Sequence, residues 1–471
     1  PVTTNDFEDL LSGTLGRVVT DFSSLVSCDR LSGGASQETY RIVIDLEDGT
    51  RQTLAMRRAA GGATEKPDPR RPGLPVEAKL MQVARAAGVP EPRVHHVLTE
   101  ADGLGLGFIM EWLEGETLGS RILRAEELDD VRPRLARECG RILARIHSID
   151  PVESGLDDHL TVVSAEDFVT RMWEQYQLFE SPQPMIDYTA RWLLQHVPAE
   201  AEPKLVHNDF RNGNLMVGPD GVRAVLDWEL AHLGDPIRDL GWICTNSWRF
   251  GQRDLPVGGF GSREDLLAGY AEESGVEVDP AHVHYWEVFG SFWWSIGCLG
   301  MAEQWRIGPD RTVERPGIAR RSSECQVDCV NLLIPGDVEL VADHVASSSV
   351  DMPSVDELVI SVRDFLRDDV REATSGRDRF LALVASNSLD IVLRELHLGP
   401  AHLAREHERL EALLATSGAL DELRWQLTRA LRDGSVDLDT PALTAHLRTT
   451  VVNQVAIDQP TYSGFLTAIG E

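Results

Sequence analysis

The sequence has 471 residues and carries 76 Asp and Glu against 45 Lys and Arg, which gives a formal net charge of −31. This length is enough for two or three domains with hydrophobic cores. Because so large a negative charge repels nucleic-acid phosphates and anionic lipid headgroups, we expect no nucleic-acid partner and no membrane partner. A small molecule is the expected partner.

Hydrophobic residues make up 42% of the chain and charged residues 26%, which excludes a disordered, collagen-like or multi-span membrane protein. The most apolar stretch, residues 288–302, is shorter than the roughly 20 residues that cross a bilayer, so it predicts a buried core helix. The six cysteines are sparse, and the chain opens without a secretion signal. We therefore expect a reducing, cytoplasmic location.

Strand patterns dominate the first part of the chain. Branched apolar residues at 41–44 and 52–56 flank an acidic turn that contains Gly49, which predicts a β-hairpin. A helix is predicted over residues 76–87 and another strand over 106–112. The order of elements changes from strands to helices after this point.

Helical spacing dominates the rest of the chain. Apolar residues in 131–149 recur at the helical period, whereas 205–227 reads as a loop followed by a small hairpin. The Ser- and Asp-rich stretch 346–354 is typical of a linker. After it, leucines and valines such as Leu358 and Val362 repeat at helical spacing, which predicts a C-terminal helical bundle.

One segment has the residue types needed for phosphoryl transfer. The stretch HNDFRNGN begins at His207 and contains Asp209 and Asn214, and a strand pair after it ends at Asp227. Transfer of phosphoryl from ATP needs a carboxylate that accepts the proton of the attacking hydroxyl, and oxygen ligands for magnesium. Taken alone, the pattern fits a set of turn-capping side chains equally well.

The surrounding sequence resembles a known family. The stretches LVHNDFRNGNLMV and AVLDWELAHLGDPIRDLGW resemble the aminoglycoside phosphotransferase and choline kinase family of small-molecule kinases, in particular the branch related to the kinase-like domains of certain acyl-CoA dehydrogenases. The resemblance implies an α+β, two-lobed protein-kinase-like fold. It places a nucleotide-binding first lobe at 1–113 and a second lobe with the acceptor pocket at 114–345. A helical domain of unknown function would follow at 355–471.

In the second lobe, the resemblance implies a role for seven residues. Asp209 would be the catalytic base, and Asn214 and Asp227 would hold Mg²⁺. His207 would support the loop by hydrogen bonding. Arg211 would either stabilise the transferred phosphoryl group or anchor the loop. Asp235 and Asp239, in the GDPIRDL stretch, would brace the site from behind.

In the first lobe, the resemblance implies a phosphate-binding loop at Gly33, Gly34 and Ser36, although a plain turn would need the same glycines. A cation is expected at the end of the second hairpin strand, where Arg57 and Arg58 stand side by side. Because side chains alternate along a strand, one of the two points inward. The family uses a cation there, and arginine keeps the charge.

Two further sets of residues would bind the nucleotide. Glu77 would orient the arginine, with a solvated surface glutamate as the alternative. Met110, Glu111 and Trp112 would form the hinge, where backbone groups meet the adenine ring.

The function implied is transfer of the γ-phosphoryl group of ATP, with Mg²⁺, to a hydroxyl of a small-molecule acceptor. The alternative is a catalytically idle kinase fold that acts as a nucleotide or metabolite sensor or as a scaffold. A protein kinase is disfavoured, because Trp228 and Glu229 follow Asp227 where protein kinases carry Phe-Gly.

The acceptor is left open by the sequence. Seven of the eleven tryptophans lie between residues 228 and 305, where they either wall an acceptor pocket or fill a helical core. Five arginines between 306 and 321 either receive an anionic acceptor, such as a hydroxyacyl-CoA, or are ion-paired. The C-terminal helices could cap the acceptor pocket, form a homodimer contact or recruit a partner. The choice between ATP and GTP is also open.

Overall fold

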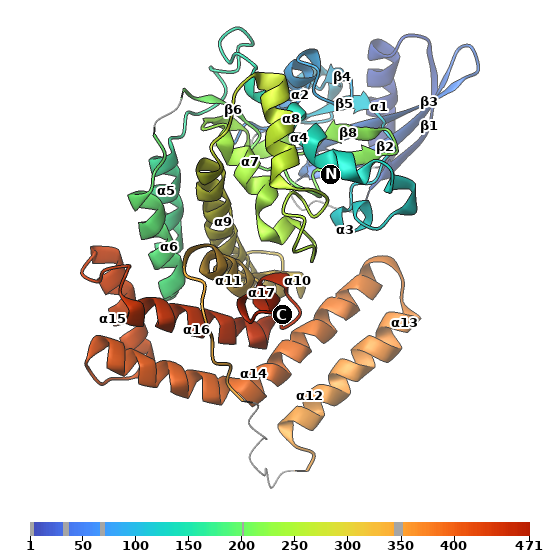
Figure 1. Cartoon of the computed structure of the whole chain (residues 1–471). Helices are drawn as coiled ribbons and strands as arrows, with labels where there is room; N and C mark the ends of the chain where they lie inside the picture. The colour runs from blue at the N-terminus through green and yellow to red at the C-terminus, as the bar shows by residue number, and fades with distance from the viewer. Residues whose placement is uncertain (1–3, 32–36, 66–70, 200–201, 343–351) are drawn as a thin grey trace.

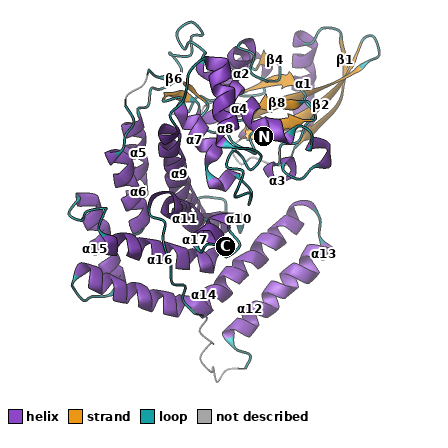
Figure 2. Cartoon of the chain, in the orientation of Figure 1, coloured by secondary structure: helices purple, strands orange, loops and turns teal. Residues whose placement is uncertain are grey.

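The structure is a computed structural model that describes residues 4–31, 37–65, 71–199, 202–342 and 352–471. Figure 1 shows a β-rich part at one end, a mainly helical middle part, and a final group of helices that packs against the middle part. Figure 2 shows that most strands gather at one end and that helices make up most of the rest. The predicted α+β class, with a β-rich first lobe, a helical second lobe and C-terminal helices, is confirmed.

The first lobe is built on a five-stranded antiparallel sheet with the strand order β1-β2-β3-β5-β4. Because side chains alternate along a strand, Ile42, Leu54 and Ile109 share one face of the sheet, where they pack with Leu11 and Leu15 of α1. The other face packs against α2 in a core that continues into the second lobe. The elements are α1 (Thr4–Val18), β1 (Phe22–Arg30), β2 (Gln37–Leu46), β3 (Arg51–Ala59), α2 (Leu74–Ala86), β4 (Val94–Val97) and β5 (Gly107–Glu111).

The predicted hairpin, which is β2 and β3, and the helix and strand after it are confirmed. The sequence carries no pattern that predicts α1 and β1. β1 is an edge strand with the mainly polar sequence FSSLVSCDR, and it therefore lacks a buried alternating face. α1 has a narrow apolar face centred on Leu11 and Leu15.

The second lobe is organised around the long helix α9, which confirms the predicted buried helix. Val288, Phe289 and Phe292 of α9 are fully buried in the main hydrophobic core. Two short strand pairs, β6 with β9 and β7 with β8, frame residues 207–214, which we call the catalytic-loop segment after the role that the resemblance implies. The elements are α3 (Gly119–Ile122), α4 (Leu135–His147), α5 (Ala165–Gln177), α6 (Pro184–Gln195), β6 (Lys204–Val206), β7 (Leu215–Gly218), β8 (Gly221–Val225), β9 (His232–Gly234), α7 (Ile237–Cys244), α8 (Arg263–Ser274), α9 (Pro280–Ile307), α10 (Glu314–Arg320) and α11 (Ser322–Leu333).

The C-terminal part is helical, as predicted. Its first helix differs from the prediction of a closed bundle, because Leu358, Val362 and Phe365 are each more than half exposed instead of facing a core. α12 runs beside the first half of α14, and the two helices project from the rest of the molecule (Figure 1). The elements are α12 (Val355–Asp364), a π-helical turn (Phe365–Val370), α13 (Arg371–Ala373), α14 (Gly376–Leu414), α15 (Leu420–Asp433), α16 (Pro441–Asp458) and α17 (Ser463–Ala468).

A single hydrophobic core joins the C-terminal helices to the second lobe. Met185 of α6 and Val327 and Val330 of α11 are buried together with Leu427 of α15 and Val452 of α16. The domain boundaries at 113, 345 and 355 stay predictions. The last two parts nevertheless bury their apolar side chains against each other, so their stabilities are coupled.

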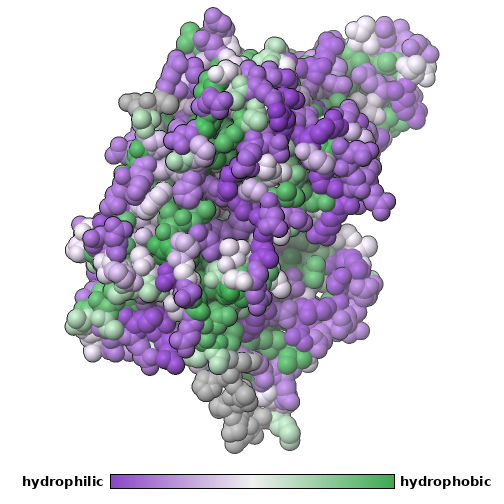
Figure 3. Space-filling view, in the orientation of Figure 1, coloured by the Kyte–Doolittle hydropathy of each residue, from purple (hydrophilic) through white to green (hydrophobic). Residues whose placement is uncertain are grey.

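Hydrophilic residues cover most of the face seen in Figure 3, and hydrophobic residues form smaller patches between them. Among the helices that the structure describes, none combines the length and the apolar character required to span a bilayer.

A buried carboxyl group holds the last helix to the second lobe. Asp328 of α11 accepts hydrogen bonds from the hydroxyl of Tyr462 at 2.6 Å and from the side-chain amide of Asn246 at 2.8 Å. Burial raises the pKa of Asp328 to about 7, in spite of these two donors. The folded protein therefore binds this proton more tightly than the unfolded chain does.

Asp328 should make stability depend on pH. Because its pKa in the folded state is about 7 against an ordinary 3.8, its stabilising contribution is complete below about pH 4 and is lost as the pH rises to about 7. The difference corresponds to about 4 kcal/mol. We expect Asp328→Asn to gain stability relative to the wild type between pH 5 and pH 8, which urea unfolding at both pH values measures.

The exposed residue Asp254 offers the control, because Asp254→Asn should follow the wild type at both pH values. If the difference between Asp328→Asn and the wild type were the same at pH 5 and pH 8, Asp328 would not titrate with folding.

Candidate active site

The catalytic-loop segment is held from behind by one buried carboxylate. Asp239, in the first turn of α7, accepts the backbone N–H of His207 at 2.9 Å and that of Asn208 at 2.7 Å. Asn208 has a φ of 67°, so these two N–H groups can converge on one side chain. Burial alone would raise the pKa of Asp239, but hydrogen bonds from His147 and the loop lower it. The loop conformation therefore depends on a charged Asp239.

Asp209 is fixed through both of its carboxylate oxygens. Oδ1 accepts a hydrogen bond from Nε1 of Trp242 at 2.8 Å and from Nε of Arg211 at 3.0 Å. Oδ2 accepts from Nδ2 of Asn214 at 2.6 Å. The side chain keeps an exposed fraction of 15%. Asp209 is thus oriented before any substrate arrives, yet one side stays open to an incoming group.

The two predicted metal ligands lie at the same end of the β7-β8 hairpin. Leu215 pairs with Val225, and the N–H of Leu226 donates to the carbonyl of Asn214 at 2.8 Å, which brings Asn214 and Asp227 together. Asp227 has a φ of 71°, which turns the chain at the end of β8. Because Nδ2 of Asn214 donates a hydrogen bond to Asp209, Oδ1 of Asn214 is left as a ligand for a metal ion.

These oxygen donors suit Mg²⁺, which prefers carboxylate and amide oxygens. Within the described ranges, no group of three or more His, Cys, Asp or Glu side chains could hold a metal ion. Asn214 and Asp227 could therefore hold a magnesium ion only if nucleotide phosphates and water complete its shell, which is common for this ion.

Arg57 of β3 links the first lobe to Asp227. Its guanidinium lies 3.6 Å from the carboxylate of Glu77 and 3.3 Å from that of Asp227. Gln37 of β2 accepts a hydrogen bond from Arg57 and donates one to Glu77 at 3.2 Å. Burial raises the pKa of Glu77, and the charge of Arg57 opposes this effect. These contacts give Arg57 a defined direction toward the metal-ligand end of the hairpin.

The neighbouring Arg58 points to the opposite face of the sheet. Its Nε donates to Glu38 at 2.7 Å, and its guanidinium lies 4.4 Å from the centre of the Phe7 ring. The alternation of side chains along β3 therefore turns Arg57, and not Arg58, toward Asp227.

The remaining predicted residues of the first lobe stay predictions. Gly33, Gly34 and Ser36 lie outside the described residues. Met110 and Glu111 end β5, which pairs with β3, and Trp112 follows directly. Their backbone therefore lies next to the strand that carries Arg57, where a hinge is expected.

His207 and Arg211 complete the loop. His207 is fully buried, and burial lowers its pKa against the pull of Asp239, so the ring is neutral at neutral pH. Its Nδ1 accepts the N–H of Asp209 at 3.2 Å. The guanidinium of Arg211 lies 4.2 Å from the centre of the Trp248 ring. His207 is thus a support of the loop, while Arg211 lies beside the Asp209 carboxylate.

Three contacts of the site are not visible as motifs in the sequence. Trp242 donates to Asp209 across 33 positions, and Gln37 bridges Arg57 and Glu77. The contact of Trp242 with Asp209 could be predicted from the sequence only if the position of α7 relative to the loop were already known. Of the two aspartates expected to brace the site, Asp239 binds the loop.

Asp235, the other expected bracing residue, is hydrogen-bonded to α9. Its carboxylate accepts from Trp286 at 2.9 Å and is hydrogen-bonded to His282 at 2.6 Å. It ties α9 to the start of α7, and so it positions the helix that carries Asp239.

The burial of Trp242 and Trp248 agrees with a packing role for the tryptophans, and the acceptor-pocket reading stays a prediction. Trp242 and Trp248 are buried, with ring centres 5.1 Å apart, and Trp293 lies 4.8 Å from Trp242. They fill the core of the second lobe. Through Asp209 and Arg211, however, Trp242 and Trp248 also border the catalytic-loop segment.

Four of the five arginines between 306 and 321 are paired with carboxylates, and the fifth, Arg311, lies 5.7 Å from the centre of the Trp305 ring. The pairs are Arg306–Glu303, Arg315–Asp310, Arg320–Asp458 and Arg321–Glu324. This observation favours the ion-paired alternative over a receptor for an anionic acceptor.

Comparison with known proteins agrees with the expected resemblance. Two relatives are acyl-CoA dehydrogenase family member 10 of Mus musculus, 31% identical over 245 residues, and acyl-CoA dehydrogenase family member 11 of Rattus norvegicus, 27% identical over 290 residues. The matches cover 50% and 57% of this chain, but only 22% and 35% of those proteins. The chain therefore corresponds to a minor part of each relative.

A crystal structure of a Ralstonia eutropha protein, provisionally named as an aminoglycoside phosphotransferase, shares the fold with a TM-score of 0.56. It is 24% identical in sequence, and the match covers 69% of this chain and 97% of that one. The predicted two-lobed, kinase-like fold is thereby confirmed.

Residues 372–462 match a domain of unknown function, DUF6285, which agrees with the predicted extra C-terminal domain. Residues 27–275, more than half of the chain, match the model of the phosphotransferase enzyme family. The chain belongs to the phosphotransferase enzyme family.

Proposed function

We propose that this protein transfers the γ-phosphoryl group of ATP, in the presence of Mg²⁺, to a hydroxyl of a small molecule. The observation that carries the proposal is the fixed carboxylate of Asp209, held by Trp242, Arg211 and Asn214, beside the oxygen donors at the end of the β7-β8 hairpin. A set of turn-capping side chains would not need a carboxylate that is held by three donors and still partly exposed.

The chain's own residues divide the work. Asp209 orients the acceptor hydroxyl and accepts its proton in the transition state. Asn214 and Asp227 hold Mg²⁺, which when bound neutralises phosphate charge. Arg57 contacts phosphate oxygens, and Glu77 keeps the side chain of Arg57 extended toward Asp227. Arg211 lies close enough to Asp209 to stabilise charge on the transferred group.

The Arg57–Asp227 ion pair supports this division. The two side chains lie 3.3 Å apart and neutralise each other, so neither charge is isolated before the nucleotide binds. When a nucleotide binds with its magnesium ion, the phosphate is a better partner for Arg57 and the magnesium ion is a better partner for Asp227. Nucleotide and metal should therefore bind together.

The acceptor class is argued from the aromatic residues beside the loop. Trp248 borders Arg211 and Trp242 borders Asp209, so an alcohol with an apolar or ring-bearing body would meet aromatic surface near the catalytic carboxylate. The relatives are named as members of acyl-CoA dehydrogenase families, so hydroxyacyl-CoA esters belong in the acceptor screen. Arg320 and Arg321 do not add support for a hydroxyacyl-CoA acceptor, because both are paired with carboxylates.

The central test is ATP binding by calorimetry with and without Mg²⁺. We expect the wild type to bind ATP more tightly with Mg²⁺, and Asp227→Ala to lose this gain by at least about tenfold, because a charge-assisted ligand is removed. Asp209→Asn should still bind Mg-ATP, but its transfer of phosphoryl to water or to an acceptor should fall by about 10²–10⁴-fold.

Asp220 provides the matched control, because it lies in the turn of the same hairpin and pairs with Arg223 on the surface. Asp220→Ala should leave Mg-ATP binding unchanged. Absence of ATP binding by the wild type under every metal condition would refute the proposal and favour a scaffold role.

Trp242 offers a second prediction. Trp242→Phe removes the N–H that donates to Asp209 but keeps an aromatic ring in the core. Because a hydrogen bond to a charged group contributes about 1.5–3 kcal/mol, kcat should fall about tenfold or more while Mg-ATP affinity stays unchanged. Phosphoryl transfer rates and calorimetry on one preparation measure both quantities.

Trp173→Phe is the control, because Trp173 also donates to a buried carboxylate, Asp187, at 2.8 Å, but lies away from the loop. It should lower stability without lowering kcat. Equal losses of kcat in both variants would mean that Trp242 acts only through the fold.

A further inference from the structure

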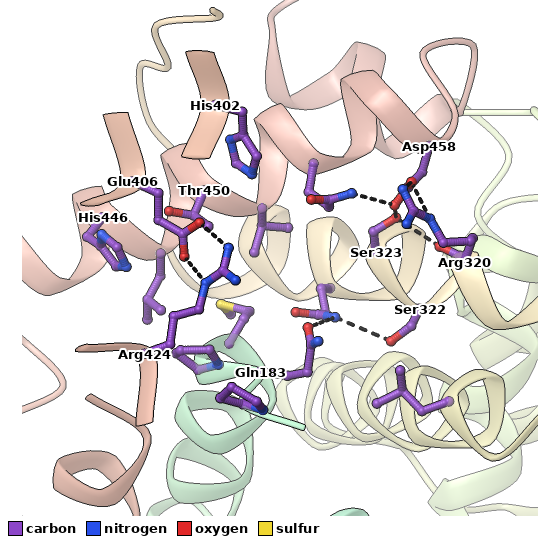
Figure 4. Close-up of a pocket in the computed structure, with 18 of the residues that line it drawn as sticks. Gln183, Arg320, Ser322, Ser323, His402, Glu406, Arg424, His446, Thr450 and Asp458 are labelled. Atoms are coloured by element: carbon purple, nitrogen blue, oxygen red, sulfur yellow. Dashed lines mark hydrogen bonds and ion pairs between the residues drawn. The ribbon is translucent and has the colours of Figure 1, made fainter. Parts of the chain in front are cut away.

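A cavity lies between the second lobe and the C-terminal helices, away from the catalytic-loop segment. It has a volume of about 270 Å³ and is drawn in Figure 4. α6, α10 and α11 of the second lobe line one side, and α14, α15 and α16 line the other. Asp209, Asn214 and Asp227 do not line it. The cavity therefore lies where the second lobe meets the C-terminal helices, apart from the candidate active site.

The walls of this cavity are mainly polar, although Met185, Leu447 and Val451 of the shared hydrophobic core contribute to them. Twelve of its 19 lining residues have polar or charged side chains. Two packed helical layers normally close over such a junction with apolar side chains. A polar cavity of this size does not stay empty, because its polar groups require water or a ligand as partner.

The charges in the wall cancel. Arg424 of α15 donates to both carboxylate oxygens of Glu406 at 2.8 and 2.6 Å, as Figure 4 shows. Arg320 of α10 donates to Asp458 at 2.7 Å. Burial alone would raise the pKa of Glu406, but the hydrogen bonds from Arg424 lower it, so this pair is ionic. A charged ligand would have to break one of these pairs.

Two imidazole rings, those of His402 and His446, line the cavity. The two residues are each 2% exposed, and Nδ1 of each is enclosed by protein without a hydrogen-bond partner, so the opposite edge of each ring is the part that faces the cavity. Figure 4 shows them on either side of Glu406, with His402 directed from α14 toward the residues of the opposite wall. Burial lowers the pKa of both rings, that of His446 to about 4, so both are neutral at neutral pH. A neutral imidazole offers one donor and one acceptor.

We propose that this cavity is a second ligand site, which takes an uncharged polyhydroxylated small molecule such as a sugar or polyol. Hydroxyl groups both donate and accept, and so they match the neutral imidazoles of His402 and His446 and the hydroxyl groups of Ser322 and Thr450. The volume of about 270 Å³ lies just below the range of about 300–1,000 Å³ for pockets that hold drug-sized ligands, which limits the occupant to about the size of one monosaccharide. The proposal does not depend on phosphoryl transfer.

The test is histidine side-chain NMR of the full chain with three probes, glucose, myo-inositol and inorganic phosphate. His402→Gln and His446→Gln assign the two resonances. We expect glucose or myo-inositol to shift both resonances in a saturable way, while phosphate leaves them in place. His446→Leu should weaken the binding of that probe about tenfold, because one hydrogen bond in a buried site is lost.

His159→Leu is the control, because His159 is exposed and lies outside the cavity, and it should leave the dissociation constant of the probe unchanged. Thermal unfolding monitors whether His446→Leu folds. Thr450→Val, which removes one hydroxyl at nearly constant size, gives an independent variant with the same expected direction.

Three results would overturn the proposal. If neither glucose nor myo-inositol moves the His402 and His446 resonances, the cavity holds water alone. If inorganic phosphate shifts the two histidine resonances as strongly as glucose or myo-inositol does, the cavity recognises charge and not hydroxyl groups. If the probe binds equally well to His446→Leu and Thr450→Val, it binds elsewhere.

Discussion

The geometry of the catalytic segment rests on one buried carboxylate that binds two consecutive backbone N–H groups. Asp239 stays charged only because His147 and the loop satisfy its oxygens, and the loop keeps its turn at Asn208 only because Asp239 accepts both N–H groups. Burying the Asp239 carboxylate without these N–H groups, or the N–H groups without the carboxylate, would cost free energy. Since α7 also carries Trp242, the same helix fixes the backbone of the loop and the carboxylate of Asp209.

A second layer of contacts extends this order across the two lobes. Arg57 reaches Asp227 from a strand of the first lobe, and Gln37 and Glu77 hold it there. The lobes are thus joined at the site through charged groups that a nucleotide could replace, while the apolar core behind α2 holds them together permanently. Two lobes that are joined in this way can change their polar contacts at the site without losing their hydrophobic packing.

Local patterns in the sequence were sufficient for the hairpin, the buried helix α9 and the loop that carries Asp209, because each depends on residues close together in the chain. They were insufficient where the deciding partner is distant. The choice between Arg57 and Arg58 depends on where Asp227 and Glu38 lie, and the contact of Trp242 with Asp209 depends on how α7 docks. The apolar spacing of α12 predicted a buried face, but spacing cannot reveal that no described segment covers Leu358.

The hydrophobic core shared by α6, α11, α15 and α16 restricts how this chain can be cut and recombined in evolution. A phosphotransferase segment that lost the last helices would expose Met185, Val327 and Val330 to water, at about 1.5–3 kcal/mol for each fully uncovered side chain. Relatives that carry the phosphotransferase part in another architecture should therefore have polar side chains at these positions, or a different domain packed over them. Substitutions on the buried faces of α6 and α11 therefore have to be matched by substitutions on α15 and α16, so the two parts of the chain are expected to evolve together.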